Sequence, residues 1–193
     1  MQYRLEINSW LRPDHPDGLI AIDGYTPFRK DRLGRRRRGG VVIYLKSSIS
    51  SQIHMVSPHV INDALETLCL KCIIDSEPYF ICATYHPPNH PSYEASTLKG
   101  YIDELSNTAL GSDSKLITTS NFNKLDHHSI LQTDLHPIFW GPTHQCLNLL
   151  DRIYGINVNL DIIHTYRSHV STHHLRVVAA LPPLSTNSSS FTE

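Results

Sequence analysis

The residues best suited to chemistry follow an apolar run in the middle of the chain. Residues 116–129 read LITTSNFNKLDHHS, so a run typical of a buried strand ends in Asn121, Phe122 and Asn123, with an acid and two histidines close behind. Asparagine has nearly the shape of aspartate, but it is neutral, cannot accept a proton near neutral pH and donates through its amide. Taken alone, the segment is better explained as a turn after a strand, where Asn is common.

The thirteen histidines offer a second chemistry, because imidazole suits zinc and other transition metals. Adjacent histidines would point apart on a strand, and no HxxxH or HxH pair lies on an evident helix face. The spacing is therefore poor for zinc, which remains a minor alternative. Its ligands would come from Asp126, His127, His128, His144, His164, His173 and His174.

Composition indicates one globular domain. The chain has 193 residues, 40% of them hydrophobic, which is enough to bury a core. Its 17 basic and 18 acidic side chains give a formal charge of -1, so any binding of nucleic acid must depend on local patches. No apolar stretch approaches the roughly 18 residues of a membrane span. We expect no membrane partner.

Four cysteines lie in apolar surroundings, and the chain shows no signal peptide. This pattern predicts reduced thiols in an intracellular compartment. Cys69 and Cys72 have the CxxC spacing, but on a strand their sulfur atoms would lie on opposite faces. We therefore expect neither a zinc site nor a redox pair there.

The elements that position the candidate residues are mostly strands. One stretch, 92–110, spaces apolar residues at helical intervals, begins near a serine cap and ends at Gly111, which predicts a helix on a sheet. Three prolines within 85–92 end the preceding strand in a rigid loop. Strands are expected at 19–25, 40–46, 65–75, 78–85, 115–121, 150–156, 160–166 and 175–181.

The two ends of the chain differ from its middle. We expect one domain over 1–182, followed by a polar tail or linker over 183–193, because STNSSSFTE has no periodicity. Met1 stands nine residues before Trp10, which leaves little room for a first strand. We expect that this strand is missing through truncation.

Seven segments, in this order, resemble the endonuclease domains of non-LTR retrotransposons, which belong to the endonuclease/exonuclease/phosphatase superfamily. They are INSWL (7–11), IDGYTPFRKDR with RRGGVVIYLK (22–46), LETLCLK (65–71), ATYHPP (83–88), TSNFNKL (119–125), GPTHQCLNLLDRIY (141–154) and STHHLRVVA (171–179).

This resemblance implies an α/β (α+β) fold, a four-layered sandwich of two mixed β-sheets flanked by helices. It implies Mg²⁺-dependent hydrolysis of a phosphodiester, which nicks DNA and frees a 3′-hydroxyl for reverse transcription. The implied partners are DNA and a C-terminal reverse-transcriptase domain, and the implied location is the nucleus. Such a site needs carboxylates to hold the cation and activate water, and a histidine to meet developing negative charge.

Three of the acids that the resemblance implies are replaced. The position of the metal-binding Glu holds Asn8, that of the catalytic Asp holds Asn121, and that of the Asp before the terminal histidine holds His173. Matching residues are kept at the four other catalytic positions, which are Asn123, Thr143, Asp151 and His174.

The same resemblance assigns DNA contacts to the basic segment 29–40 and to Tyr85. The segment carries seven basic side chains, including Arg35, Arg36, Arg37 and Arg38, and it is either a solvated loop or a hairpin that touches the DNA backbone. Two hypotheses follow. In the first, a divalent metal still binds through Asp151 and a displaced acid, for which Glu6 is the candidate because it shares a strand face with Asn8. In the second, the domain is inactive and keeps the fold and weak DNA affinity.

Overall fold

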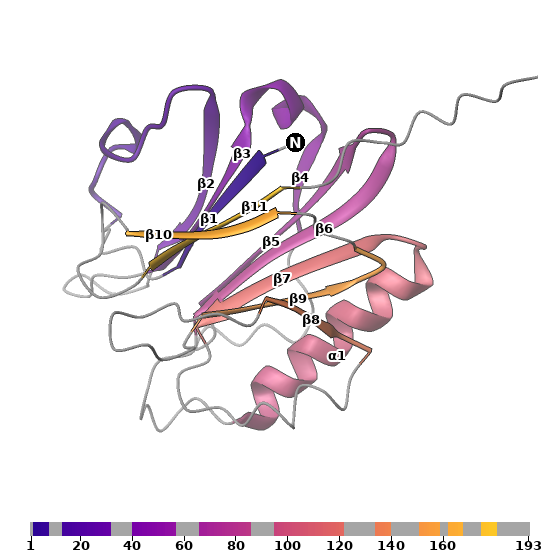
Figure 1. Ribbon diagram of the computed structural model, residues 1–193. Coiled ribbons are helices and arrows are strands. Elements are labelled where there is room, and N and C mark those ends of the chain that lie inside the picture. The colour runs from indigo at the N-terminus through magenta and orange to yellow at the C-terminus, as the bar shows by residue number, and fades with distance from the viewer. Residues whose placement is uncertain are drawn as a thin grey trace, which may run out of the picture.

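The computed structural model describes residues 2–7, 13–31, 40–56, 66–85, 95–121, 134–139, 151–158, 162–167 and 175–180. Their side chains are described over 13–31, 40–48, 52–56, 66–85, 96–120, 134–139 and 152–158. Two sheets face each other, and helix α1 covers the outer face of one of them (Figure 1).

The first sheet has five strands in the order β10-β11-β1-β3-β2, and every described pair in it is antiparallel. Its strands are β1 (Gln2–Ile7), β2 (Tyr25–Asp31), β3 (Gly40–Lys46), β10 (Ile162–Arg167) and β11 (Leu175–Ala180). Short 3₁₀ helices, η1 (Asp17–Leu19) and η2 (Ser47–Gln52), precede β2 and follow β3.

The second sheet has six strands in the order β4-β5-β6-β7-β9-β8. It is mixed, because β6 and β7 are parallel and joined through α1 (Ala95–Gly111), while the other pairs are antiparallel. Its strands are β4 (Ile53–Val56), β5 (Glu66–Ile74), β6 (Glu77–Tyr85), β7 (Lys115–Asn121), β8 (His136–Phe139) and β9 (Asp151–Ile156).

Two apolar clusters hold the layers together. One lies between the sheets and includes Val41 and Ile43 from β3 and Leu70 and Ile81 from β5 and β6. The other lies between the six-stranded sheet and α1, where residues such as Leu98 pack on the strands. Burial on both faces explains why β5 and β6 carry apolar residues at most positions of both faces.

The β5–β6 hairpin shows how local sequence sets the register. Asp75 and Ser76 have φ values of 51° and 69°, and Ile74 pairs with Glu77 across them. Two residues with positive φ make the type of two-residue turn that matches the twist of an antiparallel pair. The turn thereby fixes which residues of β5 and β6 lie opposite each other.

Most predicted elements occur close to the expected residues. Seven of the eight predicted strands match a strand of the structure within two residues, namely β3, β5, β6, β7, β9, β10 and β11. The helix predicted over 92–110 matches α1, which begins three residues later and ends one residue later. The expectation of two mixed sheets holds for the six-stranded sheet. Among the described residues there is one α-helix layer, so the fourth layer of the expected sandwich is not part of what the structure describes.

Three predictions about strands need correction. The strand expected at 19–25 is wrong: Gly24 takes φ +79° in a turn, and the strand begins at Tyr25. Pro27 is tolerated there because β2 is an edge strand. The expected absence of a first strand is also wrong, because β1 lies between β11 and β3. The short strands β4 and β8 were not predicted.

The cysteines of the CxxC motif lie on opposite sides of the sheet, as predicted. Cys69 belongs to the cluster beneath α1 and Cys72 to the cluster between the sheets. The expectation of reduced thiols is corrected for one pair, because Cys69 forms a disulfide with Cys82, its direct partner on β6. Cys146 and the predicted tail over 183–193 lie outside the described residues.

No described helix combines the length and the apolar character needed to cross a membrane.

Candidate active site

Three of the predicted site residues fall in one row across the six-stranded sheet. Tyr85, the last residue of β6, pairs with Asn121, the last residue of β7, and Asn121 pairs with Asp151, the first residue of β9. Glu66, the first residue of β5, pairs with Tyr85 on the other side. We call these four residues the edge row.

The topology explains why the row forms. β6 and β7 are parallel strands joined by a crossover helix, so both end at the same edge of the sheet. The antiparallel neighbours β5 and β9 begin at that edge. Residues 85 and 121 are far apart in sequence, and the crossover makes them neighbours. In Figure 1, β1 also runs toward this end of the molecule.

Glu66 is a site candidate that the sequence analysis did not identify. Its side chain is only 6% exposed, and Glu is seldom so buried unless it has a partner, which Glu66 has. It alternates along β5 with Leu68 and Leu70, which belong to the cluster between the sheets, and Tyr85 packs against the same cluster. A charged residue at the start of the apolar run ETLCLKCII was the only available signal.

The adjacent row is polar as well, on the side of the sheet that faces α1. Thr67 donates a hydrogen bond to Thr84 (Oγ1 to Oγ1, 3.4 Å), and Ser120 pairs with Thr84 in the parallel register. The Tyr101 hydroxyl from α1 is fully buried close to both threonines, without the geometry of a hydrogen bond to either. Burial raises the pKa of the Tyr101 phenol above its usual value, so it stays protonated.

The five-stranded sheet ends at the same side of the molecule. β1 contacts β6 and β7. Ile7, the last residue of β1, pairs with Val41, which pairs with Lys30 on β2. Glu6 pairs with Val42, so its backbone is placed in β1, and its side chain is outside the described set. β11 begins at Leu175 and runs antiparallel to β1, so its start lies beside the end of β1.

Most of the other predicted site residues cannot be placed. Asn8 follows β1 in the sequence, and His173 and His174 precede β11. The convergence of all the predicted residues on one site stays a prediction. Those that lie outside the described residues are Asn8, Asn123, Thr143, His173, His174, Arg35, Arg36, Arg37 and Arg38.

By residue type, the edge row supplies few oxygen ligands for a resident Mg²⁺ ion. Mg²⁺ requires oxygen ligands in near-octahedral order and is usually held by one or two carboxylates with water. The register makes Asp151 the backbone partner of Asn121, and Glu66 is two strands from Asn121, about 10 Å at the usual strand spacing. Among the described residues no three His, Cys, Asp or Glu side chains are grouped to hold a metal.

No protein-family model matches the chain, and no curated protein matches its sequence. Solved structures do match. The endonuclease domain of TRAS1, a telomere-specific non-LTR retrotransposon, is 12% identical with a TM-score of 0.57, over 84% of this chain and 82% of that one. The human Nocturnin catalytic domain is 12% identical with a TM-score of 0.57, over 88% of this chain and 77% of that one.

An endonuclease/exonuclease/phosphatase family protein from Leptotrichia buccalis is 10% identical with a TM-score of 0.62, over 94% of this chain and 86% of its own. At such low identity these likenesses bear on the fold alone. The chain has the fold of the endonuclease/exonuclease/phosphatase proteins.

Proposed function

We propose that the chain is a DNA endonuclease domain from the reverse-transcriptase protein of a retrotransposon, with hydrolytic activity impaired by its substituted acids. The observation that carries the proposal is the edge row, in which Tyr85, Asn121 and Asp151 meet at one edge of the sheet. Three motifs matched separately in the sequence supply these residues, and chance matches would have no reason to meet. The likeness in fold to the TRAS1 domain supports the same origin.

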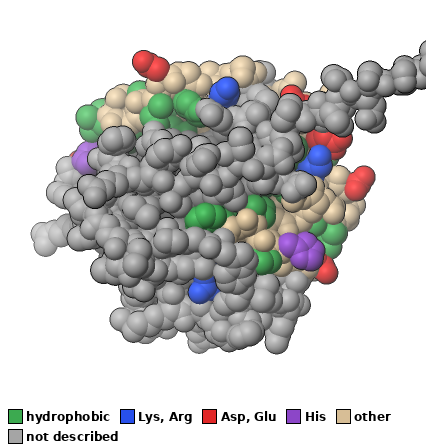
Figure 2. Space-filling model, in the orientation of Figure 1, with side chains coloured by type: hydrophobic (Ala, Val, Ile, Leu, Met, Phe, Trp, Pro, Cys, Tyr) green, Lys and Arg blue, Asp and Glu red, His purple; other side chains and the backbone are tan. Residues whose placement is uncertain are grey.

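The partners follow from the proposal. The substrate is duplex DNA, the domain acts beside a C-terminal reverse-transcriptase domain, and the protein works in the nucleus. On the face shown in Figure 2 the described Lys and Arg side chains stand singly and form no patch. DNA affinity would then depend on a few placed cations and on the basic segment 29–40, because the net charge is -1.

Impairment follows from the chemistry of the substituted groups. An amide at position 121 cannot act as a base, and a second amide at position 8 removes an anionic ligand from any cation site. We expect Mg²⁺ to bind weakly or not at all at millimolar concentration. A tight calorimetric Mg²⁺ site that disappears in Asp151→Ala would contradict this.

The test is restoration of activity. The triple variant Asn8→Glu, Asn121→Asp and His173→Asp returns the three missing acids. Relaxation of supercoiled plasmid with Mg²⁺ should be near background for the unmodified chain and clearly above it for the triple variant. Each single variant should gain little, because groups that act as a unit give strongly non-additive effects.

A matched control carries the same charge change away from the site. Asn107→Asp, Asn157→Asp and Ser112→Asp place three acids at exposed positions and should leave nicking at background. A folded but inert triple variant would refute the proposal of a repairable endonuclease. Nicking by the unmodified chain that Asp151→Ala abolishes would refute the impairment.

The second candidate is an inactive domain that keeps the fold and weak DNA affinity. Asn8, Asn121 and His173, which stand where the resemblance implies acids, favour it. DNA binding by a triple variant that does not nick would select this alternative.

A further inference from the structure

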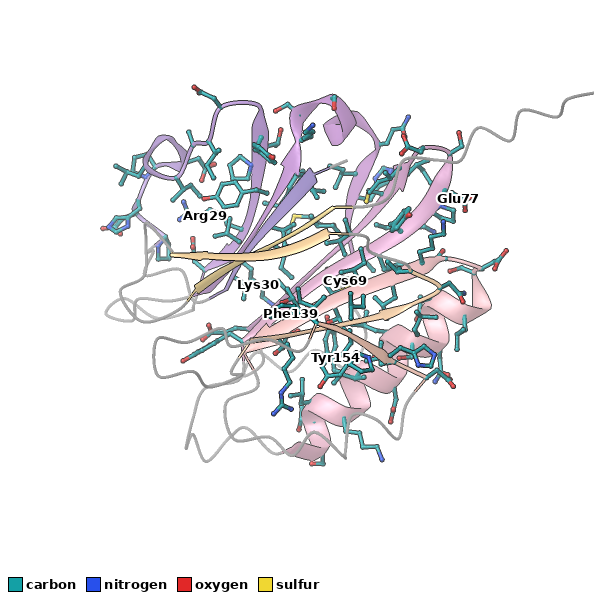
Figure 3. All side chains as sticks on the ribbon, in the orientation of Figure 1. Arg29, Lys30, Cys69, Glu77, Phe139 and Tyr154 are labelled. Atoms are coloured by element: carbon teal, nitrogen blue, oxygen red, sulfur yellow. A yellow bond between two sulfur atoms is a disulfide. The ribbon has the colours of Figure 1, made fainter. Side chains whose placement is uncertain are left out.

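Lys30 lies on the face of β2 that looks into the space between the two sheets. Two residues earlier on the same strand, Phe28 packs against the cluster between the sheets, and alternate residues of a strand share a face. The Lys30 side chain is half-buried. Figure 3 shows it in the region between the sheets, apart from Arg29. Its aliphatic stem can therefore cover apolar residues while its ammonium group reaches solvent.

The register places Lys30 at the end of the molecule where the edge row lies. Lys30 pairs with Val41, and Val41 pairs with Ile7, the last residue of β1. Figure 1 shows β1, β6 and β7 running toward the same end, where β6 and β7 contribute Tyr85 and Asn121. Lys30 and the edge row thus lie at the same end of the molecule, on opposite sheets.

Among the described residues, Arg29 has anionic partners and its neighbour Lys30 has none. The Arg29 guanidinium donates to the Asp31 carboxylate (Nη2 to Oδ2, 2.6 Å), to Asp17 (Nη1 to Oδ1, 2.9 Å) and to the carbonyl of His15. These bonds fasten the η1 segment to β2. Lys30 forms no hydrogen bond or ion pair with any side chain in the part of the chain that the structure describes.

The backbone at Lys30 is closely constrained. Gly40 pairs with Asp31 and takes φ +126°, a conformation that L residues rarely adopt. A Cβ atom at Gly40 would collide with the carbonyl oxygen of Lys30. β2 and β3 are therefore closely packed at this point, which constrains the backbone of Lys30.

We propose that Lys30 is a DNA-contacting residue whose ammonium group binds one phosphate of the duplex backbone at the end of the molecule where the edge row lies. A half-buried cation with no anionic partner loses hydration that a phosphate oxygen can replace. The proposal rests on the proposed function, because it takes DNA as the ligand. Within the basic segment 29–40, it assigns a phosphate contact to one residue of β2, on the opposite sheet from Tyr85.

The test measures how DNA affinity depends on salt. Each phosphate neutralised by a lysine releases counterions and adds about 0.9 to the slope of log K against log salt concentration. Fluorescence anisotropy with a labelled duplex, without Mg²⁺ and over about 50 to 200 mM salt, gives that slope. Lys30→Met keeps the aliphatic stem and removes the charge, so we expect a slope smaller by about 0.9. Lys30→Arg should restore it.

Lys46→Met is the matched control. Lys46 is also half-buried on the same pair of strands, but it pairs with Tyr25 at the other end, five residues or about 17 Å along β3 from Val41. It should leave the slope unchanged. Thermal unfolding of each variant shows that the fold is kept.

The outcomes separate the two proposals. If the unmodified chain binds DNA with a salt-dependent affinity and Lys30→Met leaves the slope unchanged, the Lys30 contact is refuted and the endonuclease origin is untouched. An equal loss of slope in Lys46→Met would also refute it, because the effect would come from net charge. If the unmodified chain shows no salt-dependent DNA binding, Lys30 has no such role and DNA is not the ligand of this domain.

Discussion

The strands of the six-stranded sheet are apolar in their middles and carry polar residues at one end. In its middle, Leu70, Ile81 and Ile117 are fully buried partners in one row and belong to the cluster between the sheets. Four residues further along β6 and β7, the edge row contains Glu66, Tyr85, Asn121 and Asp151. The strands therefore hold the two sheets together through their middles and carry polar residues at their ends. A substitution at these ends should disturb the core less than one in the middle row.

The largest loss of stability is expected from a substitution in the middle row. Ile81→Ala removes a side chain with 0% exposure and should lower the free energy of unfolding by about 2–5 kcal/mol, because a cavity remains. Urea denaturation measures this. A loss below 1 kcal/mol, on the order of a surface substitution, would mean that the middle row is not the core.

A smaller loss is expected from adding volume to the same region. Gly155 pairs with Ile117, and a Cβ atom there would lie 2.5 Å from Ile138 Cδ1 and 3.0 Å from the carbonyl oxygen of Leu116. Gly155→Ala should cost about 1–3 kcal/mol, because the backbone oxygen cannot move aside easily. Gly18→Ala, where a Cβ meets nothing within 4 Å, is the control. Equal melting temperatures for both variants would contradict the close approach of β9 and β7.

The Cys72 thiol gives the same core a pH dependence. Burial raises the pKa of Cys72 to about 12, whereas a thiol in the unfolded chain has a pKa near 9.0. Between these values the unfolded chain has lost the proton and the folded chain keeps it, so folding is progressively less favoured as pH rises above 9. The expected fall is about 1.4 kcal/mol for each pH unit in that window, and it is absent below it.

Cys72→Ala isolates this contribution, because other groups also titrate in alkali. The difference in unfolding free energy between the variant and the unmodified chain should be constant below pH 9 and shift in favour of the variant above it. Parallel pH profiles would show that the thiol is not buried in the folded state.

The edge row should show the smallest effect on stability. Tyr85→Phe removes one hydroxyl from a half-buried side chain and should change the unfolding free energy by about 1 kcal/mol or less. In the triple variant with restored acids, the same change should weaken DNA binding or nicking measurably. A large loss of stability would place Tyr85 in the core and remove the distinction between the two regions.

The sequence by itself determined most of the strands and the helix. The runs of β3, β5 and β6 carry apolar residues on both faces, and the period of α1 differs from theirs, so each pattern is readable locally. Its motifs also predicted Asn121 and Asp151 as site residues, and the register of β7 and β9 makes these two residues direct partners. It misplaced the strand near Tyr25 because the positive φ of Gly24 is not visible in an apolar pattern, and it missed β4 and β8, which are four residues each.

Only the tertiary structure decided which residues meet. The partnership of Glu66 with Tyr85 depends on a hairpin register, and that of Tyr85 with Asn121 depends on a parallel crossover through α1. The contrast between Arg29, held by two aspartates, and Lys30, one residue later, depends on which face of β2 looks toward the other sheet. The local sequence RKD gives both cations the same neighbours. Their different contacts arise because Lys30 shares the face of Phe28, which packs against the cluster between the sheets, whereas Arg29 lies on the other face and pairs with Asp17 and Asp31.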